Sequence, residues 1–130
     1  MFDWTGYLTV AEDLYAGRGT TASEEARLRA AVSRAYYAAF CPARDLLIDE
    51  GEISPARRDE PRLHVEVATR FKSKSDGRRA KIGKWLFRMR EHRNACDYEA
   101  EVPSLPEVAR VTLQEARWTL EHIAKLRGVA

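Results

Sequence analysis

The stretch that most directly indicates the fold is IGKWLFRMREHRNACDYEA, residues 82–100. Counted in steps of three and four, its apolar side chains recur as one stripe, as on the buried face of an α-helix. The stripe consists of Ile82, Leu86, Met89, Cys96 and Ala100. Arg93 occupies a position of this stripe where another apolar residue is expected. Because an isolated buried charge is costly, Arg93 must face a carboxylate, a subunit interface or an anionic ligand.

Four further segments carry apolar residues at helical spacing. Two of them begin with a capping box, at Thr21–Glu24 and at Ser104–Glu107, and each box predicts the start of a helix. Pro42 lies inside the longer of these helices, where it removes a backbone donor, so we expect one bent helix rather than two. The other two segments are shorter and lie around residues 4–15 and 63–71.

These segments, with no strand-like alternation between them, predict an all-α fold. We expect an up-and-down bundle of four principal helices plus a shorter helix, with residues 1–130 forming a single domain. The last helix carries a second apolar row, which consists of Val108, Val111 and Trp118. Either this row meets a second subunit in a homodimer, or both rows pack inside one bundle.

The cysteine content and the length of the apolar runs limit the classes of protein to which the chain can belong. Cys41 and Cys96 have neither the close spacing of a metal site nor the density of a disulfide framework, so we expect two reduced thiols in a cytoplasmic protein. The sequence shows neither the pattern of an export signal nor an apolar run long enough to span a membrane. We therefore expect no membrane contact, and no residue pattern indicates a metal ion or a cofactor.

Charge is distributed unevenly along the chain. The net charge is only +2, yet residues 57–93 hold 13 Lys/Arg against 5 Asp/Glu. A segregated positive field suits an anionic partner such as RNA, whereas the alternative is a solvated pair of basic helices with acidic neighbours folded over it. The basic residues that the first interpretation assigns to RNA are Arg78, Arg79, Lys81, Lys84, Arg88 and Arg90.

Two groups of residues resemble the HEPN superfamily of small prokaryotic helical domains. The first is SRAYYAAF, residues 33–40, and the second is RNACDY, residues 93–98, which looks closest to the branch whose motif ends in Asp-Tyr. The resemblance implies a helical bundle, usually a dimer, in which the arginine motif of each subunit faces a shared cleft. It also implies a metal-independent ribonuclease, often a toxin paired with a nucleotidyltransferase-type antitoxin, or a non-catalytic member of the same superfamily.

The candidate catalytic residues that follow from this resemblance are Arg93, Asn94, Asp97 and Tyr98. Arg93 suits a phosphate because its planar fork donates two parallel hydrogen bonds and stays charged. The ribonuclease members are similar to one another in carrying a histidine after about four to six intervening residues beyond the arginine, and this chain has Tyr98 after four intervening residues. Histidine transfers protons near neutral pH, which an unperturbed tyrosine or aspartate does not. His64 and His92 are possible substitutes, and whether the chain is an enzyme is open at this point.

Arg34 and Tyr37 are the remaining candidates for RNA contact. Tyr37 lies off the apolar stripe of its helix and Arg34 lies one turn away, whereas Tyr36 lies in the stripe and is expected in the core. A purely structural alternative is an ion pair between Arg93 and Asp97, one helical turn apart, that closes the bundle. The sequence thus predicts an HEPN-like RNA-binding protein, with a non-catalytic dimeric interaction module partnering a nucleotidyltransferase or another protein as the alternative.

Overall fold

The computed structural model describes residues 2–129 and is helical throughout its regular parts. Its elements are α1 (Gly6–Ala16), α2 (Glu24–Asp49), a short 3-10 turn (Pro55–Arg57), α3 (Leu63–Lys72), α4 (Gly77–Tyr98) and α5 (Leu105–Leu126). No strand occurs within the described range. The prediction of an all-α fold is therefore confirmed.

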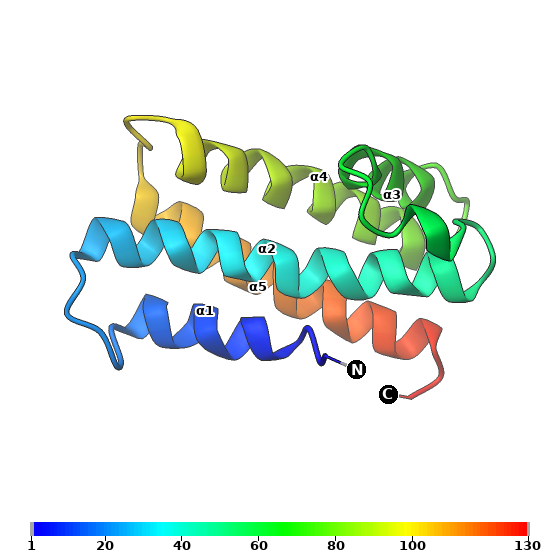
Figure 1. The fold of residues 1–130 in the computed structure, drawn as a ribbon, viewed down its shortest axis with the longest axis horizontal. Helices are drawn as coiled ribbons and strands as arrows, with labels where there is room; N and C mark the ends of the chain where they lie inside the picture. Colours follow the sequence, from blue (N-terminus) through cyan, green and yellow to red (C-terminus); the bar gives the residue numbers. More distant parts are fainter. Residues whose placement is uncertain (1, 130) are drawn as a thin grey trace.

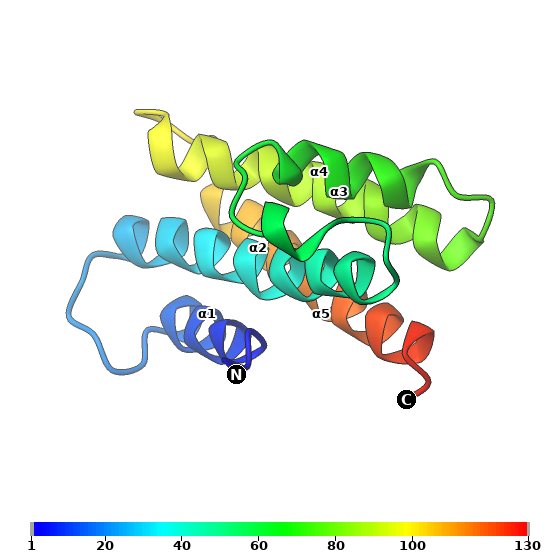
Figure 2. The same cartoon turned by 45° about the vertical axis from the view of Figure 1, so that its right-hand side comes forward.

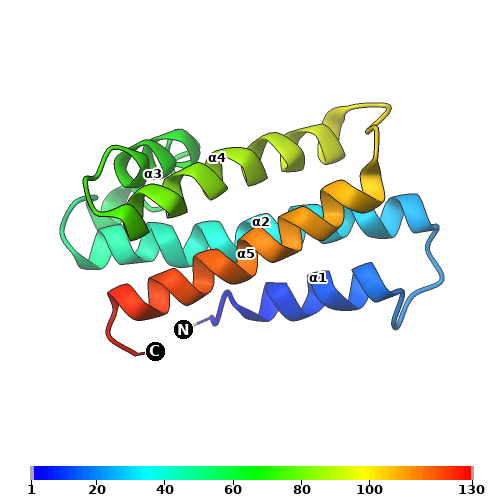
Figure 3. The ribbon, with the colours of Figure 1, turned by 180° about the vertical axis from the view of Figure 1, so that it is seen from behind.

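The helix α2 is the centre of the bundle, since it packs against α1, α3, α4 and α5. The helices α1, α2, α4 and α5 close into a ring, because α5 also packs on both α1 and α4, and successive helices of the ring run in opposite directions (Figures 1 and 3). The short helix α3 packs against α4, near the C-terminal end of α2 (Figure 2). This is the expected up-and-down bundle with one additional short helix.

The predicted stripe of α4 packs into the core. Ile82, Leu86, Met89 and Cys96 are all buried, whereas Ala100 lies beyond the end of the helix and is exposed. On the facing helix Tyr36 is fully buried, as its place in the stripe of α2 predicts. The stripe therefore runs from the core at one end of α4 to the bundle edge at the other, and Arg93 lies in the last turns before that edge.

The two capping boxes are placed differently from the prediction. The long helix starts at Glu24, because Ser23 has the extended backbone of a cap and its Oγ accepts a hydrogen bond from the backbone N of Ala26 at 3.2 Å. At the start of α5, Ser104 has a left-handed backbone with φ of 56° and its side chain makes no capping hydrogen bond. The prediction of a capping box at Ser104–Glu107 is therefore wrong, although α5 does begin there.

Several smaller expectations have a clear outcome. The helix α2 continues through Pro42, which confirms one helix rather than two. Cys41 and Cys96 are free and buried. In the second apolar row of α5, Val108 packs against a small cluster inside the bundle, whereas the ring of Trp118 is exposed and packs beside Trp85, with 5.5 Å between the ring centroids. None of the described helices combines the length and the apolar character that crossing a bilayer requires.

The packing of α3 on α4 depends on a close backbone contact at Gly83. A Cβ atom built on Gly83 would lie 2.3 Å from the backbone nitrogen of Lys72. Only a residue without a side chain fits there, so Gly83 fixes the distance between the two helices. This contact also fixes where α3 carries His64, which becomes important at the site below.

Candidate functional site

Arg93 lies over two successive tyrosine rings of α2. Its guanidinium carbon is 5.4 Å from the centroid of the Tyr36 ring and 5.4 Å from that of Tyr37, within the range of cation–π attraction. Its Nη1 is 3.6 Å from Oδ2 of Asp97, and its buried Nε has no acceptor among the residues described. The side chain is only 11% exposed. Arg93 is thus held by two ring faces and one long ion pair, with donor capacity left over.

Asp97 joins the two halves of the resembling sequence in space. Besides Arg93, its Oδ2 accepts a long hydrogen bond of 3.5 Å from Oγ of Ser33 on α2. Residues 33–40 and 93–98 therefore lie side by side where α2 packs against α4. The ion pair expected from the spacing of Arg93 and Asp97 is present, but it is long.

Arg34 and Tyr37 lie together at the outer side of this group. The guanidinium carbon of Arg34 is 5.3 Å from the centroid of the Tyr37 ring and 4.8 Å from that of Tyr7 on α1. The half-buried Tyr37 therefore contacts two guanidinium groups, that of Arg34 and that of Arg93. Arg34, Tyr37 and Arg93 form one surface. We call these three residues and Asp97 the Arg93 site.

Asn94 and Tyr98 stand apart from these contacts. Asn94 is half-buried, and Tyr98 is 77% exposed at the last residue of α4. On a regular helix Tyr98 lies one turn beyond Asn94, on the face adjacent to that of Arg93 and Asp97. Of the four candidate catalytic residues, the structure places Arg93 and Asp97 in contact with each other and Tyr98 in solvent.

His64 reaches this region from α3, which its place in the sequence could not show. Its Nδ1 is 2.7 Å from the hydroxyl oxygen of Tyr36, and its ring stacks on Phe40 with 4.3 Å between the centroids. Burial raises the pKa of Tyr36, so the hydroxyl keeps its proton, and the tautomer of His64 determines which of the two groups donates in this hydrogen bond. His64 is thereby held in one orientation beside the rings that carry Arg93.

The field at His64 is positive. Burial, followed by the charges of Arg93, Arg90 and Arg44, lowers the pKa of His64 to about 4. The ring is therefore neutral at pH 7 and is a weak proton acceptor there. The other substitute, His92, lies on a different face of α4, with its Nδ1 3.3 Å from Oγ1 of Thr112 on α5. His64 rather than His92 is thus the histidine associated with Arg93.

Arg29 anchors the end of α4 that bears the motif. Its Nη1 donates to the carbonyl oxygens of Cys96 at 2.9 Å and Glu99 at 2.7 Å, and its Nη2 donates to that of Ala100 at 2.9 Å. The last carbonyls of a helix have no partner within the helix, and here one guanidinium donates to that of Cys96 in the last turn of α4 and to those of Glu99 and Ala100 just beyond it. Sequence analysis missed Arg29, because nothing in its local pattern indicates a contact with a segment some 70 residues away.

Replacing Arg29 with glutamine is expected to loosen the last turn of α4. Three charge-assisted hydrogen bonds are lost, so the amide of Glu99, which bonds the carbonyl of Ala95 at 2.9 Å, should exchange with solvent about tenfold faster. Hydrogen exchange followed by NMR measures this rate. Arg27→Gln is the matched control, because Arg27 donates instead to the carbonyl of Leu14 at 2.7 Å and should leave Glu99 unchanged. Equal protection of Glu99 in all three proteins would contradict the anchoring role.

Two of the basic residues predicted to contact RNA are engaged with carboxylates that are not part of the Arg93 site. Arg79 donates to both carboxylate oxygens of Glu50, at 2.9 and 2.6 Å. Arg88 lies 2.7 Å from the buried carboxylate of Glu115 on α5. Their charges are therefore shared with acidic side chains of the same bundle and do not line the Arg93 site.

The other predicted basic residues are spread along α4. Arg78, Lys81 and Lys84 are exposed in its first turns, and helical rise places Arg78 about 22 Å from Arg93. Arg90 is nearer, one turn before Arg93, and its buried Nε has no acceptor in the described part of the chain. Of these basic residues, Arg90 is therefore the one whose charge acts at the Arg93 site.

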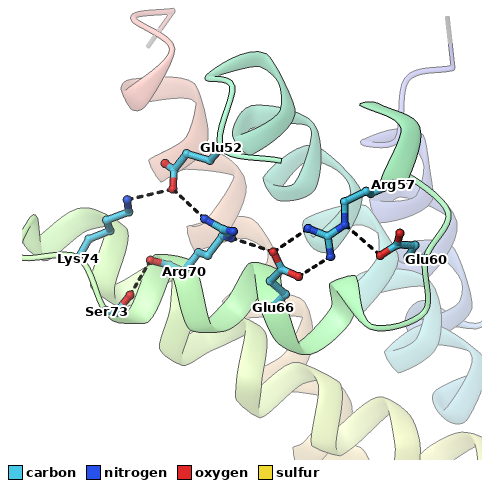
Figure 4. Close-up of polar contacts among 7 residues, drawn as sticks. All are labelled: Glu52, Arg57, Glu60, Glu66, Arg70, Ser73 and Lys74. Carbon is cyan, nitrogen blue, oxygen red and sulfur yellow. Dashed lines mark hydrogen bonds and ion pairs between the residues drawn. The ribbon is translucent and has the colours of Figure 1, made fainter. Parts of the chain in front are cut away.

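The remaining positive charge of residues 57–93 is largely absorbed by a row of alternating charges along α3, which we call the charge ladder (Figure 4). Arg70 lies between two carboxylates, 3.8 Å from Glu52 and 3.0 Å from Glu66. Arg57, hydrogen-bonded to Glu66 at 2.6 Å, is the main reason why the pKa of Glu66 falls to about 2. The ladder runs in the order Lys74, Glu52, Arg70, Glu66, Arg57 and Glu60. Acidic neighbours folded over the basic segment, the alternative interpretation of its charge, are thus present.

Neither a metal centre nor a known relative supplies a function for this site. Within residues 2–129, no group of three His, Cys, Asp or Glu side chains is placed to hold a metal ion. When the chain is compared with known proteins, no family model, no curated protein and no solved structure matches it.

Proposed function

We propose that this chain is an HEPN-like RNA-binding protein that contacts an RNA phosphate through Arg93. The observation that carries the proposal is the incomplete pairing of Arg93, whose Nε has no acceptor in the described chain and whose ion pair with Asp97 is 3.6 Å long. A phosphate at this surface would replace or share that carboxylate and accept two parallel hydrogen bonds. Arg34 adds a second guanidinium beside the Tyr37 ring, with 5.3 Å between the guanidinium carbon and the ring centroid.

Binding is better supported than cleavage. Cutting RNA through its own 2′-hydroxyl needs groups that accept and donate protons near the operating pH. His64, the histidine beside this site, has a pKa of about 4, and Tyr98 is exposed to solvent. We therefore place RNA binding first and treat metal-independent endoribonuclease activity, of the toxin–antitoxin or defence type, as its extension. The resemblance adds a homodimer with two facing arginine motifs and a nucleotidyltransferase-type antitoxin as partner.

The second candidate is a non-catalytic dimeric interaction module that partners a nucleotidyltransferase or another protein. The observation that favours it is the low exposure of Arg93, together with two exposed aromatic residues, Tyr98 at the end of α4 and Trp118 on α5. Exposed aromatic side chains are enriched at protein interfaces. In this case Arg93 stabilises the bundle edge and the surface around it binds protein.

Replacing Arg93 with glutamine is expected to weaken binding to single-stranded RNA at least tenfold, because one phosphate contact is lost. Fluorescence anisotropy with labelled RNA, in EDTA and at several salt concentrations, measures the affinity, and a gel of the same samples detects cleavage. Arg18→Gln is the matched control, since Arg18 is an exposed arginine on the turn after α1, paired with Asp13 at 2.9 Å. Undetectable affinity of the wild type at low salt, or equal affinity of wild type and Arg93→Gln, would favour the interaction module instead.

A further inference from the structure

A pocket lies next to the Arg93 site and shares Tyr37 with it. It has a volume of about 260 Å³ and is formed by the middle of α2, the segment before α3 and the first turn of α3. Tyr37 and His64 line it together with Arg44 and Arg58. Because drug-sized ligands occupy roughly 300–1,000 Å³, this pocket suits a smaller group.

Arg44 is the unusual residue of this pocket. It is only 7% exposed, and its Nε donates to Oδ1 of Asp45 at 3.1 Å, but its buried Nη2 has no acceptor in the described chain. The guanidinium carbon lies 5.5 Å from the ring of Trp4 and 5.9 Å from that of Phe40, so aromatic side chains hold it in place. Leaving a buried donor unpaired is unfavourable, and native structures usually supply an acceptor. The arrangement therefore indicates a ligand that accepts a hydrogen bond.

The acidic side chains around this pocket do not supply that acceptor. One oxygen of Asp45 serves two arginines, since Arg58 Nη1 also donates to Oδ1, at 2.9 Å. Glu60 lines the pocket but accepts a hydrogen bond from Arg57 at 3.0 Å, and Asp59 is exposed. Arg44 and Arg58 together thus share a single carboxylate, and neither of the acidic side chains that line the pocket, Asp59 and Glu60, is hydrogen-bonded to them within the described chain.

We infer that this pocket binds a phosphate group, which accepts hydrogen bonds from Arg44 and Arg58 beside the ring of His64. A tetrahedral phosphate can accept hydrogen bonds from both guanidinium groups at once. The inference rests on the proposed function in that an RNA bound at Arg93 would bring a neighbouring phosphate to this pocket. A free nucleotide or inorganic phosphate has the same chemistry and is the second source.

Phosphate binding should change the pKa of His64. Its pKa of about 4 reflects burial and then nearby arginine charge, so an anion at the pocket should raise it by roughly 1 or more. The groups that face the ring or line the same pocket are Arg44, Arg90, Arg93, Tyr36, Cys41, Arg58, Asp59 and Glu60. The charges that act on the His64 pKa are those of Arg93, Arg90 and Arg44, which all lower it, so an added anion acts on the ring with the opposite sign.

The experiment is an NMR titration of the His64 ring with inorganic phosphate, uridine 5′-monophosphate and a short oligouridine. We expect a saturable change with phosphate and an upward shift of the His64 pKa. Arg58→Gln should weaken phosphate binding about tenfold, and Arg44→Lys, which keeps the charge but removes the Nη2 donor, should also weaken it. Arg62→Gln is the matched control, because Arg62 is an exposed arginine of the same segment that does not line the pocket.

The outcomes separate this inference from the proposed function. If neither phosphate nor the nucleotide changes the His64 signal while RNA affinity still depends on Arg93, the inference is wrong and the RNA proposal stands. If phosphate saturates the wild type and Arg58→Gln loses this response while RNA does not bind, the pocket is established for a free phosphate compound and the RNA proposal fails. A non-saturating response, or one equal in the wild type and Arg58→Gln, also overturns the inference.

Discussion

Replacing Gly83 with alanine is expected to lower the free energy of unfolding by about 3 kcal/mol. The added Cβ would lie 2.3 Å from the backbone nitrogen of Lys72 and 2.6 Å from its Cα. Both are backbone atoms, which cannot move aside as the end of a flexible side chain can, so α3 must shift away from α4. Alanine's better helix propensity returns only about 1 kcal/mol, which is too little to offset the clash.

The matched control for this substitution lies on the same helix. Gly77 is the first residue of α4, and nothing lies within 4 Å of a Cβ built on it. Gly77→Ala should therefore leave the stability unchanged or raise it by up to about 1 kcal/mol. Urea denaturation followed by circular dichroism compares the two variants with the wild type. If Gly83→Ala were as stable as Gly77→Ala, the close approach of α3 and α4 would be refuted.

Replacing Arg88 with methionine is expected to cost about 2 kcal/mol at pH 7. Glu115 is only 1% exposed, and Arg88 Nε is 2.7 Å from its Oε2, while Oε1 has no partner in the described chain. The substitution leaves a buried carboxylate without its cation. Because the Arg88 side chain is itself 60% exposed, the effect stays below the ~3–5 kcal/mol of fully buried pairs.

The pH dependence gives this second prediction a sign. Burial already raises the pKa of Glu115 above the usual glutamate value, and losing Arg88 raises it further. Between the usual glutamate pKa and the raised pKa of the folded state, the folded protein holds a proton on Glu115 that the unfolded chain has lost. The free energy of unfolding therefore falls as the pH rises through this range. The difference in stability between the wild type and Arg88→Met should therefore become smaller at pH values below the usual glutamate pKa.

Two further variants isolate the role of the buried carboxylate. Combining Arg88→Met with Glu115→Leu should recover most of the lost stability, since the uncompensated charge is removed. Arg110→Met is the control for an exposed arginine, as Arg110 pairs with Glu107 on the surface of α5, and it should change stability by less than about 0.5 kcal/mol. A double variant no more stable than Arg88→Met alone would contradict the explanation.

The helices could be predicted from the sequence because their signal is local. The stripe from Ile82 to Cys96 has the period of a helix, and each of its apolar members is buried. The predicted cap of α2, Thr21, lies two residues before the observed cap, Ser23, because both are good capping residues and the hydrogen bond from the backbone N of Ala26 to Ser23 Oγ forms only in the folded chain. At Ser104 the left-handed φ, which no local pattern indicates, prevents the side chain from capping α5.

The candidate site was predictable only where it depends on residues of one helix. The stripe identified Arg93 as a charge at a core position, and the spacing to Asp97 predicted their ion pair. The hydrogen bond between His64 and Tyr36 joins residues on different helices, as do the contacts of Arg29 with the end of α4. Counting charges likewise indicated a basic segment, but which carboxylates neutralise it is determined by tertiary packing.

The charge ladder on α3 has a consequence for behaviour on heating. The cost of removing charged groups from water falls as temperature rises, so networks of alternating charges weaken less on warming than isolated contacts do. The helix α3 itself is short, Leu63–Lys72, and its ladder reaches back through Arg57 and Glu52 to the segment before it. The ladder therefore contributes to the stability of a ten-residue helix that would otherwise unfold early on heating. At raised temperature it helps to keep His64 within hydrogen-bonding distance of Tyr36.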